Sequence, residues 1–101
     1  MRARPILAAA ALCLPASVRA ESMLTSYYPA PAAHIAAHRS LPKGTRVILT
    51  NPRNGRSAHV VIGHRGPFVR GRSLDISTQR ARQLGITRSG VARLNARVER
   101  R

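Results

Sequence analysis

Acidic side chains and histidines are the groups in this sequence best suited to proton-transfer chemistry. The acids are Glu21, Asp75 and Glu99. A glycosidase with two opposed carboxylates is disfavoured, because such a pair must flank one bond at about 5–9.5 Å and only Asp75 lies in the interior of the predicted domain. Two roles for Asp75 stay open: a reacting carboxylate, or a structural one that accepts hydrogen bonds from loop amides, Arg65 or Arg72.

The sequence has four histidines. His34 and His38 have a spacing that would suit a metal on a helix, but nearby prolines disfavour a helix and no thiol or carboxylate completes a site. We therefore expect neither a metal nor a cofactor. His59 is expected to face solvent on a strand, whereas His38 and His64 are expected in loops beside strands, where functional groups concentrate. These two are the candidates for proton transfer, because histidine ordinarily titrates near neutral pH.

Composition limits the size of the protein and the class of its partner. The chain has 101 residues, with 18 Lys+Arg against 3 Asp+Glu and a formal net charge of +15. This length accommodates one small domain, and 44% hydrophobic with 3% aromatic residues predicts a modest aliphatic core. Charge alone does not name a partner. A basic nucleic-acid-binding module is an alternative, disfavoured because only Tyr27, Tyr28 and Phe68 could stack on bases.

Residues 1–20 have the pattern of a secretory signal peptide. Arginines precede an apolar run that ends at Leu14, and small residues lead to a cleavage site after Ala20. Cleavage would leave a domain at residues 21–101 in the periplasm or cell envelope. The apolar run is about half of the ~20 residues that a membrane-spanning helix needs, so we expect no integral membrane span. Cys13 follows a leucine rather than a small residue, which argues against a lipid anchor.

Hydrophobic patterns predict short strands, one hairpin and one helix. The predicted strands cover residues 22–28, 45–50, 58–62, 73–76 and 91–98, the helix covers residues 78–84, and loops cover residues 29–37 and 63–71. Asn54 and Gly55 predict the hairpin because both tolerate positive φ. Ser77 is the predicted N-cap of the helix, and Gly85 its end. The two strands around the hairpin are almost continuously apolar in the middle, which favours a closed barrel or a strand covered on both faces.

Three segments, taken in order, carry a family resemblance. They are residues 36–47 (AAHRSLPKGTRV), 50–57 (TNPRNGRS) and 65–77 (RGPFVRGRSLDIS). Together they resemble the rare lipoprotein A (RlpA)-like double-psi β-barrel family, and the likeness extends from about residue 26 to residue 98. It implies an all-β fold, a six-stranded double-psi β-barrel with one short helix. It also implies an endolytic lytic transglycosylase that cleaves peptidoglycan between N-acetylmuramic acid and N-acetylglucosamine, leaving a 1,6-anhydro end.

The resemblance also assigns site residues. The histidine of the family's Ala-Ala-His motif corresponds to His38, the family has an aspartate where this chain has His64, and a further acid expected upstream is missing from residues 29–37. The candidate catalytic residues are His38, His64 and Asp75, and the candidate substrate-binding residues are Tyr28, Arg39 and Arg65. Because this reaction uses no water, one acid/base could protonate the leaving oxygen and then deprotonate O6. His38 would be that acid/base or orient the substrate, and Arg65 would order the loop or bind a substrate oxygen.

His64 leaves two functions open. An imidazolium there could donate a proton, but a cation opposes the positive charge that develops on the sugar. We therefore expect either a weakened transglycosylase or a non-catalytic peptidoglycan-binding barrel, with the arginines attracting peptidoglycan carboxylates or forming a solvated face. The expected partner is the peptidoglycan glycan strand, with divisome or other cell-wall proteins as further candidates, no nucleic acid, and a monomeric state.

Overall fold

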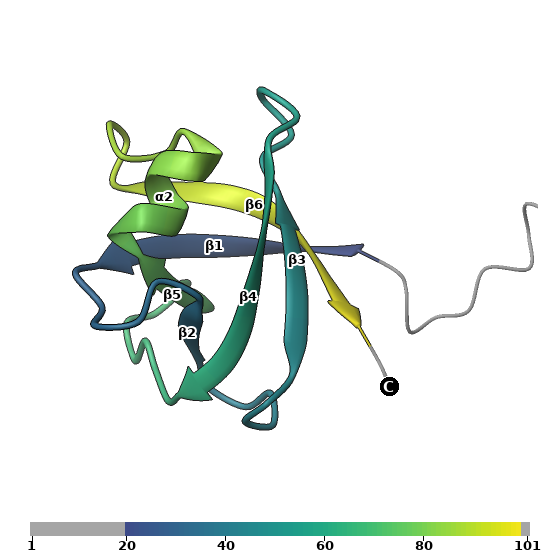
Figure 1. Cartoon of the computed structure of the whole chain (residues 1–101), viewed down its shortest axis with the longest axis vertical. Coiled ribbons are helices and arrows are strands. Elements are labelled where there is room, and N and C mark those ends of the chain that lie inside the picture. The colour runs from purple at the N-terminus through teal and green to yellow at the C-terminus, as the bar shows by residue number, and fades with distance from the viewer. Residues whose placement is uncertain (1–19, 100–101) are drawn as a thin grey trace, which may run out of the picture.

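The structure, a computed structural model, describes residues 20–99. Residues 1–19 of the predicted signal peptide, with Cys13, lie outside the described residues. Six strands and one helix follow one another along the described part: β1 (Ala20–Tyr28), β2 (Ile35–His38), β3 (Arg46–Thr50), β4 (Ser57–His64), β5 (Leu74–Ser77), α2 (Thr78–Leu84) and β6 (Val91–Glu99) (Figure 1).

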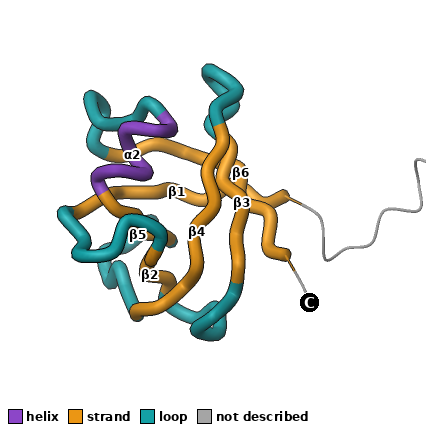
Figure 2. The backbone as a smooth tube through the Cα atoms, in the orientation of Figure 1, coloured by secondary structure: helices purple, strands orange, loops and turns teal. Residues whose placement is uncertain are grey.

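The strands close into a single barrel in the order β1-β5-β2-β4-β3-β6. Two neighbouring pairs, β1 with β5 and β2 with β4, are parallel, and the other four are antiparallel. The helix α2 lies against the barrel beside β4, β5 and β1 (Figure 2). The prediction of a six-stranded barrel with one short helix is confirmed. No helix among residues 20–99 is long and apolar enough to cross a membrane.

Aliphatic side chains fill the barrel. Val47 and Leu49 of β3 are fully buried, while Ile48 between them is half-buried on the outer face. The strand predicted to alternate most clearly, β6, buries Leu94 and Ala96 and exposes the neighbouring Arg93, Asn95 and Arg97. The apolar strands thus reflect closure of the barrel, one of the two arrangements predicted, rather than a layer covering their outer faces.

Local signals place the hairpin and the helix where the sequence predicts them. Gly55 has φ 77 in the turn between β3 and β4. The Ser77 hydroxyl accepts a hydrogen bond from the backbone N–H of Arg80 at 3.1 Å, and so caps the helix. Gly85 ends the helix in the left-handed conformation, with φ 76 and ψ 33. Both ends of the helix therefore follow from single residues.

Two loop predictions are wrong in part. The sequence predicts a loop over residues 29–37, but Ile35–His38 forms β2. Its alanines have little intrinsic strand preference, and hydrogen bonding to β4 on one side and β5 on the other imposes the extended conformation. The loop predicted from residue 63 begins later, because β4 continues to His64. His38 and His64 are therefore the last residues of strands rather than loop residues.

Candidate functional site

Four adjacent strands place three polar residues in one row. Ser26 of β1 is the register partner of Asp75 in β5, Asp75 is the partner of Ala37 in β2, and Ala37 is the partner of His64 in β4. Register partners lie on the same face of a sheet. The residues on either side of Asp75 are fully buried in the core, so this row lies on the outer face of the barrel.

A register shift brings His64 onto that face. Ala36 is paired with Ile62 and Ala37 with His64, so Gly63 is an extra residue in β4. An extra residue reverses the alternation of inward and outward side chains beyond it. Ile62 is buried in the core, and His64 is exposed in the outer row.

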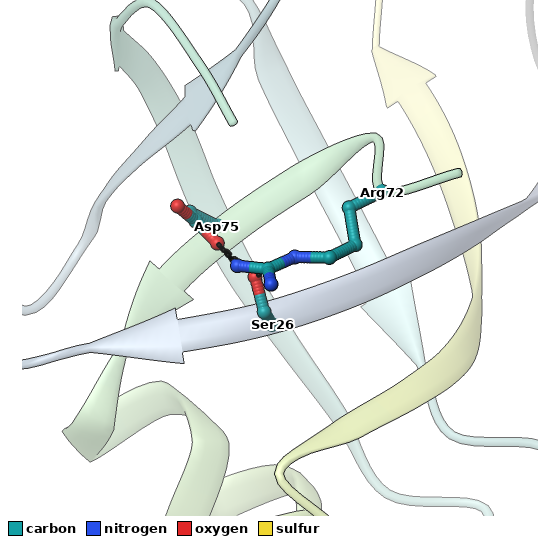
Figure 3. A network of polar contacts seen from close by, with 3 residues as sticks. All are labelled: Ser26, Arg72 and Asp75. Carbon is teal, nitrogen blue, oxygen red and sulfur yellow. Dashed lines mark hydrogen bonds and ion pairs between the residues drawn. The ribbon is translucent and has the colours of Figure 1, made fainter. Parts of the chain in front are cut away.

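Asp75 is held by a hydroxyl and a guanidinium (Figure 3). The Ser26 hydroxyl donates a hydrogen bond to Asp75 Oδ1. Arg72 donates from Nε to Ser26 Oγ at 3.1 Å, and its Nη2 lies 3.7 Å from the same Oδ1. The side chains of Arg72 and Asp75 are 31% and 22% exposed. Of the two arginines considered as partners, Arg72 lies beside Asp75, and both contacts engage Oδ1.

His38 has a fixed tautomer. Its Nδ1 accepts hydrogen bonds from the backbone N–H groups of Ser40 at 3.1 Å and Leu41 at 3.0 Å. A ring nitrogen that accepts hydrogen bonds carries no proton, so Nε2 carries the proton of the neutral ring. A proton on Nδ1 would point at the N–H groups of Ser40 and Leu41, which would repel it. His38 is thus arranged as a neutral donor at Nε2.

The charges around His38 act in both directions. Burial lowers the pKa of His38, the negative charge of Glu21 raises it, and the positive charges of Arg39 and Arg65 lower it, with a net decrease. His38 is the register partner of the buried Leu74 and the last residue of β2, so it lies at the rim of the barrel on the face opposite to that of Asp75 and the outer row. The lowered pKa and the fixed tautomer both favour the neutral ring.

Arg65 contacts the chain that follows His38. Its Nη1 donates to the carbonyl oxygens of His38 at 3.0 Å and Leu41 at 2.7 Å. This is the loop-ordering contact that the sequence offered as one of two roles. Arg39 is exposed next to His38. Tyr28 ends β1, and burial together with the negative charge of Asp75 raises the pKa of the Tyr28 phenol.

Comparison with known proteins places the chain in a family. Residues 30–96, more than half of the chain, match the model of a double-psi β-barrel family described as "Lytic transglycolase". The chain belongs to the RlpA-like family of double-psi β-barrels. The resemblance noted in the sequence is thereby confirmed.

Curated relatives support this assignment. A probable endolytic peptidoglycan transglycosylase RlpA of Nostoc sp. is 60% identical over 68 residues, covering 67% of this chain and 18% of that protein. One from Aquifex aeolicus is 48% identical over 65 residues, covering 64% of this chain and 29% of that protein. The endolytic peptidoglycan transglycosylase RlpA of Pasteurella multocida is 47% identical over 66 residues, covering 65% and 22%. The chain spans less than a third of the length of each.

Sequence reasoning missed two residues of this candidate site. Ser26 becomes a partner of Asp75 only through parallel pairing of distant strands, and no local pattern indicates it. Glu21, taken for the first residue of the mature chain, lies in β1 close enough for its charge to act on His38. Residues 20–99 contain no cluster of three or more potential metal ligands. A groove lined by residues 41–46 with Val98 and Glu99 includes none of the candidate site residues.

Proposed function

We propose that this chain is an exported endolytic peptidoglycan transglycosylase that acts in the cell envelope, cleaving the bond between N-acetylmuramic acid and N-acetylglucosamine. Membership of the RlpA-like family and the names of the relatives support the proposal. The observation that carries it is the place of Asp75 on the outer face of the barrel, in the same row as His64. Glu21 and Glu99 are exposed, whereas Asp75 is half-buried and held by Ser26 and Arg72.

Asp75 would act as the acid and then as the base. The protonated carboxyl donates its proton to the glycosidic oxygen as the bond from that oxygen to C1 breaks. The sugar's own O6 attacks C1, and the O6 proton passes to the Asp75 carboxylate, which restores the starting state without water. Because Ser26 and Arg72 both engage Oδ1, both transfers would pass through Oδ2. The carboxylate also stabilises positive charge at C1 between the two transfers.

His38 would orient the substrate. Of its two expected roles, acid/base and orientation, the fixed tautomer favours orientation: neutral Nε2–H donates a hydrogen bond to a sugar oxygen and has no free lone pair. Arg65 supports this role by fixing the His38 loop. Tyr28 and Arg39, on either side of the candidate site, would contact substrate hydroxyl and carboxylate groups.

Digestion of isolated sacculi tests the proposal. Mature protein is incubated with sacculi, and released 1,6-anhydro-muropeptides are identified by mass spectrometry. Asp75→Asn should abolish release. His59→Ala is the matched control, because His59 is exposed on β4 away from the row, and it should release as much as the wild type. Release that survives Asp75→Asn would contradict the assignment of Asp75.

A non-catalytic peptidoglycan-binding barrel is the second candidate. The observation that favours it is His64, an exposed side chain in the outer row where the family resemblance implies an aspartate. A histidine there supplies no negative charge to stabilise the positive charge of the transition state. This candidate predicts that the wild type sediments with sacculi but releases no anhydro product.

A further inference from the structure

Two large apolar side chains stand exposed on the loop that joins β4 to β5. Phe68 is 77% exposed and Val69 is 50% exposed. They are adjacent in sequence, and arginines lie on both sides of them. Single exposed apolar residues are common on protein surfaces, but this pair stands on a loop whose two ends contact residues of the candidate site. None of the roles proposed above uses either side chain.

The loop is fixed to the candidate site at both of its ends. At its start, Arg65 donates to the carbonyl oxygens of His38 and Leu41. At its end, Arg72 contacts the pair formed by Ser26 and Asp75. The apolar tip therefore lies between two anchors, one on the strand end that carries His38 and one on Asp75.

The tip itself has a defined conformation. The backbone N–H of Arg72 donates to the carbonyl oxygen of Val69 at 3.1 Å, and the N–H of Ser73 donates to that of Leu24 at 2.9 Å. The Phe68 ring lies against Gly66, because a Cβ atom built on this glycine would stand 3.6 Å from Cε2 and 3.8 Å from Cδ2 of the ring. The ring thus has Gly66 as a near neighbour and is largely open to solvent.

We infer that Phe68 and Val69 form a sugar-binding subsite next to Asp75, which takes the apolar face of an N-acetylhexosamine ring of the glycan strand. An aromatic ring buries the C–H groups of a pyranose and needs no charge to do so. Both anchors are candidate site residues, so a sugar on the tip belongs to the same strand whose bond lies at Asp75. The inference rests on the proposed function for the identity of the polymer.

An anionic membrane is the rival occupant, because arginines flank the apolar tip. A bilayer seated on Phe68 would contact the tip alone and make no use of the candidate site, to which Arg65 and Arg72 hold the two ends of the loop. An extended glycan strand can occupy the tip and the site together. The geometry therefore favours the sugar.

Binding of an N-acetylglucosamine tetrasaccharide, followed by calorimetry and by NMR, tests the subsite independently of cleavage. Phe68→Ala should raise Kd about three- to tenfold, and Phe68→Trp should restore wild-type binding because it keeps an aromatic face. His59→Ala is the control, since His59 is exposed on β4 away from the outer row, and it should leave Kd unchanged. If sacculi are cleaved, Phe68→Ala should raise KM and leave kcat unchanged.

The outcomes separate the subsite from the proposed function. The protein could bind the saccharide in a way that depends on Phe68 and yet not cleave sacculi. This result would support the subsite and contradict the proposed transglycosylase activity. Equal saccharide binding by the wild type and Phe68→Ala, or no binding by the wild type, overturns the subsite. If Phe68→Ala no longer binds phosphatidylglycerol vesicles but binds the saccharide as the wild type does, the sugar-binding subsite is overturned and the membrane is the occupant of the tip.

Discussion

Replacing Gly63 by alanine tests the packing that puts the outer row together. Gly63 is the extra residue of β4, and a Cβ atom there would stand 2.7 Å from Cγ2 of Ile35 in β2. This distance is shorter than ordinary carbon–carbon contacts of about 3.5–4.0 Å. The backbone at Gly63 does not have positive φ, so any cost of Gly63→Ala comes from this contact and not from backbone strain.

Two effects of opposite sign set the magnitude. Overpacking costs about 1–3 kcal/mol, while alanine in a strand is favoured over glycine by roughly 0.5–1 kcal/mol. The contact involves a methyl group on the branched Cβ of Ile35, and rotation of this side chain about χ1 is restricted. We therefore expect Gly63→Ala to lower the free energy of unfolding by about 1–2 kcal/mol, a fall in Tm of roughly 4–16 °C for a domain of this size.

Urea and thermal unfolding of a double-mutant cycle provide the measurement. In an Ile35→Ala background the Cγ2 atom is gone, so Gly63→Ala should become neutral or stabilising. Ile35→Val is the control, because valine keeps the branched carbon and should keep the cost. A Gly63→Ala protein as stable as the wild type, or an equal cost in the Ile35→Ala background, would refute the reasoning.

Three further predictions concern the site and export. The pKa of His38 is lowered in the folded state, so its contribution to stability is present above the ordinary histidine value of about 6.5 and is lost as pH falls below it. Urea unfolding between about pH 5 and 8 should therefore show that the stability of His38→Gln depends less on pH than that of the wild type. An equal pH dependence of the two proteins would contradict the shift. His64→Asp should raise the release of anhydro-muropeptides from sacculi by placing a carboxylate in the outer row, whereas background release from both proteins would favour the non-catalytic barrel. The intact mass of the exported protein should correspond to a chain that begins at Glu21 without lipid; a mass that includes a diacylated Cys13 would show the export prediction to be wrong.

Local signals in the sequence predict the parts of the fold that single residues determine. Ser77 and Gly85 give the helix its observed ends, because capping acts within one turn. The strand β2 escapes prediction because its alanines and the preceding prolines resemble a loop, and only pairing with β4 and β5 makes it extended. Tertiary pairing of this kind overrides weak local preference.

The candidate site shows the same contrast between features that local sequence predicts and features that depend on strand pairing. The position of Asp75 in a strand can be predicted from its apolar neighbours, but its partner Ser26 lies 49 residues earlier in the chain. The side that His64 faces depends on the one extra residue, Gly63, and simple alternation along β4 would place it inward. Sequence periodicity thus finds the candidates, and strand register decides which of them meet.

The pairing of β1 has a consequence for how the chain folds. Its two neighbours in the barrel, β5 and β6, begin only at Leu74 and Val91. The first strand therefore has no partner until the last third of the chain is available, and such long-range closure is slow because the intervening loop must first be ordered. For the exported chain proposed above, this order would delay barrel closure until nearly the whole polypeptide has crossed the membrane, which keeps the chain extended while it is threaded.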